Sequence, residues 1–150
     1  MKINITKKHY KLLIEMLFAG NWLINGHRLP AERLDNYEQL EQHFLSFFKE
    51  FHMDDYIEYD DKHNSYYHTR KFEDEFFDKG YIEDYDEDTF WEELISRLAL
   101  RDMVRDYGPE QINKMDDSTR LKKRFEYEEK YNCEFEENGL DKLIIHEKNK

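Results

Sequence analysis

Forty consecutive residues, 54–93, carry the whole net charge of this chain and nearly half of its aromatic side chains. The segment contains sixteen acidic residues and four Lys or Arg, so its formal charge is −12, whereas the rest of the chain has 19 of each and is neutral. Eleven of the 24 aromatic residues also lie here. Disordered acidic segments are poor in aromatic residues, and each buried ring removes about 150–250 Å² from water. We therefore expect this acidic segment to fold with its rings inward and its carboxylates outward.

The length of the chain favours one domain. At 150 residues, it has the size at which a domain buries roughly two-thirds of the surface of its unfolded chain. Two prolines and five glycines leave no stretch with the composition of a linker. A charged fraction of 39% and a mean hydropathy of −1.05 are typical of disordered chains, but the aromatic content of 16% argues for a core. We predict a single domain over residues 1–150.

The cysteine content and the hydropathy pattern indicate a soluble cytoplasmic protein. Cys133 is the only cysteine, so no disulfide can form within the chain, and a reducing compartment is the simplest setting. The most apolar run, residues 16–24, is interrupted by Gly20 and Asn21 and is too short to cross a bilayer. Glu15 interrupts the region that a signal peptide would need to be apolar. We expect no membrane association.

The periodicity predicts a mainly α fold, a bundle of four to five helices with a small β-hairpin. Thr6, Pro109 and Gly139 stand where helix caps or first turns are expected. Apolar residues spaced by three and four indicate one clear core-facing stripe, made of Tyr37, Leu40, Phe44, Phe47 and Phe51. Helices are expected over residues 6–24, 36–51, 89–107, 109–114 and 117–139, with another beginning near Pro30.

Helical spacing fails between residues 56 and 70, where the sequence predicts a hairpin. Two short runs rich in tyrosine, 56–59 and 65–69, are separated by the polar stretch 60–64. Residues 72–88 are expected to be irregular or briefly helical. The ends of the chain, 2–5 and 143–145, could form two further strands that pair with each other.

The charge distribution leads to the first functional hypothesis. A surface of carboxylates repels nucleic-acid phosphates and anionic lipids, and it attracts basic proteins. We therefore predict a non-enzymatic binding module that docks a basic partner, without direct contact to nucleic acid. In a sharper form, the carboxylates stand in for phosphates and occupy a nucleic-acid-binding protein. The expected contact residues are Asp55, Glu58, Asp60, Asp61, Asp84, Asp86 and Asp88.

Metal binding is the rival hypothesis. Asp84-x-Asp86-x-Asp88 resembles the start of a calcium loop, but its sixth and twelfth positions hold Thr89 and Ile95 instead of Gly and Glu, so the match fails. Carboxylate and imidazole groups within residues 54–68 suit zinc, and the rival function is therefore a metal-binding protein or a metal-dependent hydrolase. The candidate ligands are Asp61, His63 and His68.

No cofactor is predicted. In a third hypothesis, exposed aromatic rings of the chain pair with a second copy of the same chain.

Three arginines repeat every four residues in the helix predicted over 89–107. Arg97, Arg101 and Arg105 form a stripe that could bind a phosphate or a carboxylate. Glu93 and Asp102 lie four and three residues before Arg97 and Arg105, which favours ion pairs within the helix. We expect the stripe to serve internal ion pairs.

No signature of a nucleophile elbow, a phosphate loop or a dinucleotide site is present, and we expect no enzymatic activity.

The stretches 20–25 (GNWLIN), 44–51 and 90–102 (FWEELISRLALRD) resemble small acidic bacterial proteins that share this helix order and have no assigned activity. The resemblance implies the same helical fold and supplies no catalytic residues.

Overall fold

The computed structural model describes residues 4–144 of the chain, which divide into two compact units. Unit 1 is Met1–Glu83 and unit 2 is Asp84–Lys150. Six α-helices and one two-stranded sheet lie within the described residues, which confirms the mainly α fold with a small hairpin. The single domain expected from the length remains a prediction. The elements are α1 (Lys7–Asn25), the 3₁₀ turn η1 (Pro30–Glu32), α2 (Asp35–Leu45), β1 (Ile57–Asp60), β2 (Ser65–His68), α3 (Arg70–Phe77), α4 (Tyr81–Tyr107), α5 (Pro109–Lys114) and α6 (Asp117–Asn138).

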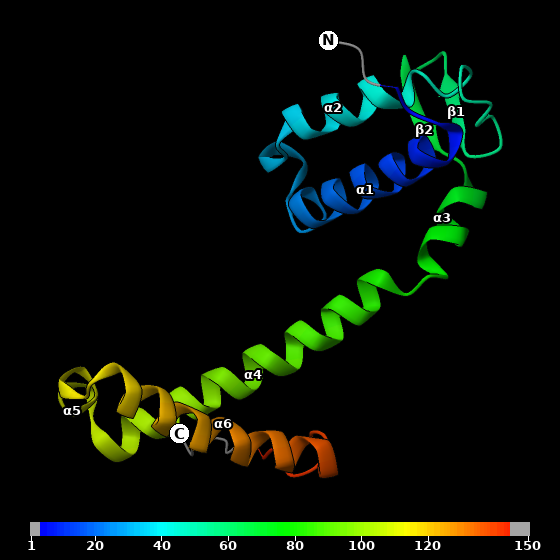
Figure 1. The fold of residues 1–150 in the computed structure, drawn as a ribbon. Helices are drawn as coiled ribbons and strands as arrows, with labels where there is room; N and C mark the ends of the chain where they lie inside the picture. Colours follow the sequence, from blue (N-terminus) through cyan, green and yellow to red (C-terminus); the bar gives the residue numbers. More distant parts are fainter. Residues whose placement is uncertain (1–3, 145–150) are drawn as a thin grey trace, which may run out of the picture. The chain divides into compact units, whose positions relative to one another are not determined.

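In unit 1, α1 and α2 lie side by side and the hairpin packs at one end of this pair (Figure 1). The Thr6 side chain accepts a hydrogen bond from the backbone N–H of His9 at 3.2 Å, so α1 begins where its N-cap predicts. The core of the unit draws on α1, α2, the turns after α2, β1 and α3. Its buried members are Tyr10, Ile14, Leu45, Phe48, Met53, Ile57, Phe72 and Phe76.

The hairpin has the predicted position. β1 and β2 pair antiparallel, with Ile57 opposite His68 and Tyr59 opposite Tyr66. The side chain of Gln42 on α2 binds the backbone of Tyr66 twice: Nε2 donates to the carbonyl and Oε1 accepts from the N–H, both at 2.8 Å. This pair of hydrogen bonds fixes β2 against α2.

The helix expected over residues 36–51 is shorter than predicted. α2 ends at Leu45, and the chain continues in tight turns in which His52 adopts a left-handed φ of 52°. These turns bring Phe48 and Met53 into the core. The predicted stripe is also wrong in its first half, because Tyr37 and Leu40 are 40% and 45% exposed. The buried residues of α2 are instead Glu41 and Leu45.

Helix α4 begins at Tyr81, eight residues before the start expected from Thr89. The acidic residues there do not prevent helix formation, since carboxylates are favourable near a helix N-terminus. The preceding segment forms α3, with Thr69 as its N-cap. In unit 2, α4 and α6 run antiparallel and are joined by α5 (Figure 1). Asp116 caps α6, and Gly139, with φ of 54°, ends it as predicted.

The predicted terminal strands lie partly outside the described residues. Neither residues 4–5 nor residues 143–144 belong to a strand. Within residues 4–144, no helix combines the length and the apolar character needed to cross a bilayer.

Candidate functional site

Two adjoining cavities lie between α1, α2 and β2 in unit 1. Their volumes are about 190 and 390 Å³, and four polar residues line both of them: Asn21, Arg33, Glu41 and His68. We call this joint space the polar cavity. Its walls combine a carboxylate, an imidazole, an amide and a guanidinium, which is the range of groups found where proteins bind polar ligands.

A chain of amide hydrogen bonds holds the Glu41 side chain in place. Asn21 and Asn25 are four residues apart and therefore share one face of α1. Asn25 accepts from the backbone N–H of Leu34 at 2.9 Å and donates to Asn21 Oδ1 at 2.8 Å. Asn21 in turn donates to Glu41 Oε2 at 2.6 Å. The other carboxylate oxygen, Oε1, has no hydrogen bond within residues 4–144.

His68, the last residue of β2, lines the same space and has a buried nitrogen without a hydrogen-bond partner among the described residues. Its ring stacks on Phe72 with centroids 4.2 Å apart and meets the edge of Phe18 at 4.9 Å. Its side chain is 8% exposed, and Nε2 is buried with no hydrogen-bond partner among the described residues. Glu41 Oε1 lies 3.8 Å from this nitrogen, which is too long for a hydrogen bond. A buried polar atom of this kind calls for an explanation such as a ligand or an ordered water.

Burial shifts the pKa values of the two groups in opposite directions. Loss of solvation lowers the pKa of His68 to about 4, so its imidazole is neutral at pH 7. Burial also raises the pKa of Glu41; the hydrogen bond from Asn21 opposes this shift, and the nearby Glu38 carboxylate adds to it. Charge on either group is therefore costly unless something in the cavity compensates it.

The structure brings together three of the four docking residues predicted in unit 1. Glu58, Asp60 and Asp61 line one shallow depression of about 830 Å³ around the hairpin, together with Tyr67. Asp55 is outside this depression, and its carboxylate lies 3.0 Å from the Lys71 ammonium.

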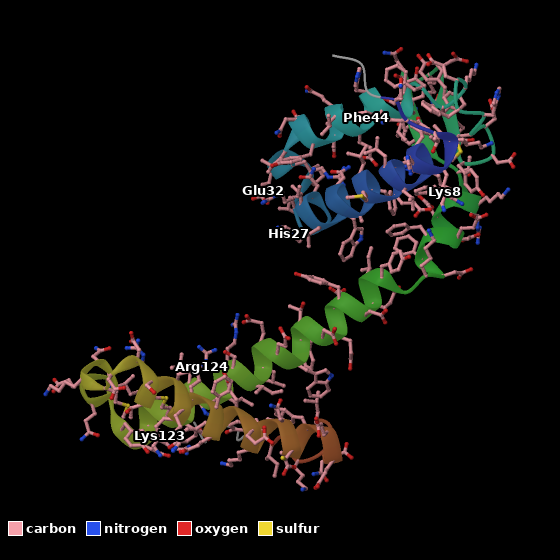
Figure 2. The ribbon with its side chains drawn as sticks, in the orientation of Figure 1. Lys8, His27, Glu32, Phe44, Lys123 and Arg124 are labelled. Carbon is pink, nitrogen blue, oxygen red and sulfur yellow. The ribbon has the colours of Figure 1, made fainter. Side chains whose placement is uncertain are left out.

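The other three predicted docking residues belong to unit 2. Asp84, Asp86 and Asp88 lie exposed in the first half of α4, and none has an ion-pair partner within residues 4–144. Asp88 also lines a cavity of about 640 Å³ between α4 and α6, where Arg124 donates to Ser96 at 2.9 Å. Figure 2 shows Arg124 on α6. Of the sixteen carboxylates in the acidic segment, eleven have no ion-pair partner in the described part of the chain.

The candidate metal ligands Asp61, His63 and His68 all line the depression around the hairpin, but their side chains do not converge on one point. His63 Nδ1 lies 2.6 Å from Asp60 Oδ2, in the turn of the hairpin, whereas the His68 ring is buried against Phe72. Across residues 4–144, no group of three His, Cys, Asp or Glu side chains is placed to hold a metal ion. Asp61, His63 and His68 therefore do not form a three-ligand set in this structure.

The arginine stripe takes part in ion pairs within α4. Arg97 Nε lies 2.8 Å from Glu93 Oε2, four residues away. Asp102, whose side chain is 3% exposed, lies 2.8 Å from Arg101 and 3.2 Å from Arg105, and it accepts a hydrogen bond from the Tyr131 hydroxyl at 2.5 Å. Burial alone would raise the pKa of Asp102, but the hydrogen bonds from Tyr131 and Arg101 outweigh it and lower the pKa.

Replacing Asp102 by alanine is expected to destabilise unit 2 by about 1–3 kcal/mol, because the Tyr131 hydroxyl loses its charged acceptor. Asp102→Asn keeps an acceptor and is expected to cost less. Denaturation followed by Trp91 fluorescence in a Trp22→Phe background reports on unit 2, since each unit contains one tryptophan. Equal losses for the two variants would show that the hydrogen bond to Tyr131 is unimportant.

Sequence reasoning did not identify Asn21, Asn25 or Glu41 as site residues. One signal was present: two asparagines at i and i+4 in or next to the most apolar run of the chain predict a polar pair on one helix face. The partners that bury Glu41 come from distant positions and leave no local pattern.

Comparisons of this chain with models of protein families, with curated proteins and with solved structures gave no match.

Proposed function

We propose that the protein is a non-enzymatic binding module that docks a basic partner protein through acidic segment 54–93, with residues 84–93 of α4 as a main contact. The supporting observation is the large number of carboxylates without a cationic partner. In residues 84–93, six carboxylates and no Lys or Arg occur, and among the described residues only Glu93 has an ion-pair partner.

Repulsion among these carboxylates opposes the favourable interaction of acidic residues with the N-terminus of α4. Asp84 is three and four residues from Glu87 and Asp88, and Asp88 is four residues from Glu92. Like charges at these spacings each cost about 0.2–0.5 kcal/mol. The cationic groups of a basic partner would offset this repulsion. Relief of the repulsion would therefore add to the free energy of binding.

Exposed rings lie among the same carboxylates. Tyr85 and Phe90 are 54% and 47% exposed. Aromatic side chains contribute strongly to protein interfaces, and their faces attract the ammonium and guanidinium groups of a basic partner. A surface that served solubility alone would not require them.

The docking proposal predicts that the triple variant Asp84→Lys, Asp86→Lys, Asp88→Lys loses affinity for its partner by at least about tenfold, or about 1.4 kcal/mol. The partner is first isolated from cells of the source organism, and its dissociation constant is then measured at several salt concentrations. The variant is also expected to show a weaker salt dependence, because fewer opposite charges meet at the interface.

A matched control has the same change in net charge on α6 of the same unit. Glu129→Lys, Glu136→Lys, Glu137→Lys alters three exposed carboxylates outside the acidic segment. It is expected to leave the affinity within about twofold. If both triple variants weaken binding equally, net charge alone determines it and the proposed docking surface is wrong.

A further inference from the structure

On each of two largely buried side chains of the polar cavity, one polar atom has no hydrogen-bond partner within residues 4–144. Asn21 and Asn25 are engaged with each other and with Glu41, and Arg33 donates to Glu38 at 2.9 Å. Gln42 is occupied by the backbone of Tyr66. These two atoms are Glu41 Oε1 and His68 Nε2, which lie 3.8 Å apart on side chains that are at least nine-tenths buried.

The charge of the lining selects the kind of ligand. The carboxylates of Glu38, Glu41 and Glu73 line the larger cavity, and Arg33 is its only Lys or Arg. Because Arg33 is paired with Glu38, the buried Glu41 has no cation of its own in the described residues. An anion would be repelled, and a neutral ligand would leave the carboxylate of Glu41 uncompensated at a buried position.

The geometry matches a group that carries several N–H donors. His68 is neutral, and in the tautomer with its proton on Nδ1 its Nε2 is an acceptor. A carboxylate oxygen and an imidazole nitrogen 3.8 Å apart can both be reached by one nitrogen about 2.9 Å from each. An ammonium or the terminal NH₂ of a guanidinium satisfies both acceptors and supplies the missing positive charge.

We propose that the polar cavity binds an organic cation through an ammonium or guanidinium group, which donates to Glu41 Oε1 and His68 Nε2. The cation can come from a free small amine or from a lysine or arginine side chain of another protein. Only the second source rests on the docking proposal above.

The test uses the full chain and three probes of equal length: butylammonium, butanol and butyrate. Titration calorimetry measures affinity, and the NMR shift of the Asn21 side-chain amide reports the site. Butylammonium is expected to bind saturably, and Glu41→Gln is expected to weaken it at least tenfold while keeping an acceptor for Asn21. The matched control Glu50→Gln, an exposed carboxylate of the same unit outside the cavity, is expected to stay within twofold.

Two outcomes would overturn the proposal: unchanged butylammonium affinity in Glu41→Gln, or binding of butyrate as tight as that of butylammonium. If Glu41→Gln does not fold, His68→Phe is measured in its place. This variant removes the second acceptor and is expected to weaken the binding of butylammonium. A glycine–serine peptide with one lysine separates the sources, since tighter binding than butylammonium favours a protein side chain and equal or weaker binding favours a free amine. The α4 triple variant is expected to bind butylammonium normally, so this proposal and the docking proposal can fail separately.

Discussion

Phe72→Ala is expected to lower the unfolding free energy of unit 1 by about 3–5 kcal/mol, the usual cost of removing a buried ring. Phe72 is 1% exposed and lies at the centre of the aromatic core. Its ring stacks on His68 at 4.2 Å and on Phe76 at 6.1 Å, and it meets the edge of Phe18 at 5.4 Å. Urea denaturation followed by Trp22 fluorescence in a Trp91→Phe background measures the loss.

The control for this prediction is Phe77→Ala, the same change on the same helix. Phe77 is 39% exposed and has edge contacts with Phe18 and Phe76. Its removal is expected to cost about 1 kcal/mol or less, because little apolar surface leaves the core. If the two alanine variants are equally destabilised, Phe72 is not the centre of the core.

The second large effect is a loss of stability in acid that depends on His68. Its pKa falls from 6.5 to about 4 on burial, so the unfolded chain binds more protons than the folded chain between these values. The contribution is fully present above pH 6.5 and is lost as pH falls toward 4. The whole loss amounts to about 3 kcal/mol, because a tenfold change in proton affinity corresponds to about 1.4 kcal/mol. The unfolding free energy of unit 1, measured from pH 7 to pH 4, tests this.

Glu41 acts in the opposite direction. Its raised pKa means that the folded chain keeps a proton which the unfolded chain releases, so its contribution to stability grows as pH falls. The unfolding free energy of Glu41→Gln is therefore expected to fall more steeply between pH 7 and pH 4 than that of the unmodified chain. His68→Phe keeps a ring between Phe18 and Phe72, and its unfolding free energy is expected to depend less on pH than that of the unmodified chain. Parallel pH curves for the unmodified chain and His68→Phe would exclude His68 as the cause.

The parts of the fold that depend on neighbouring residues could be predicted from the sequence. Thr6, Pro109 and Gly139 mark helix ends through their own backbone and side-chain properties, and the structure has helix ends at or beside all three. The hairpin followed from two tyrosine-rich runs around a polar turn. In each case the determining interaction lies within a few residues.

The end of α2 and the polar cavity depend on residues far apart in the chain. Continuing α2 to residue 51 satisfies the local pattern, whereas in the structure Phe48 and Met53, in the turns after Leu45, pack in one core with residues of α1 and β1. Glu41 has the composition of a solvated helix position. It is buried because Asn21, twenty residues earlier, and His68, 27 residues later, close over it. Periodicity within one helix contains no information about such partners.

The two hydrogen bonds from Gln42 to Tyr66 have a consequence for the outer side of the hairpin. Thr69 N–H donates to the Tyr56 carbonyl across the sheet, so by alternation the N–H and C=O of Tyr66 point away from β1. An edge strand with unpaired N–H and C=O groups is a template on which another chain can add a strand and begin to aggregate. The amide of Gln42 occupies both groups and takes the place of that strand, so the small sheet ends at β2.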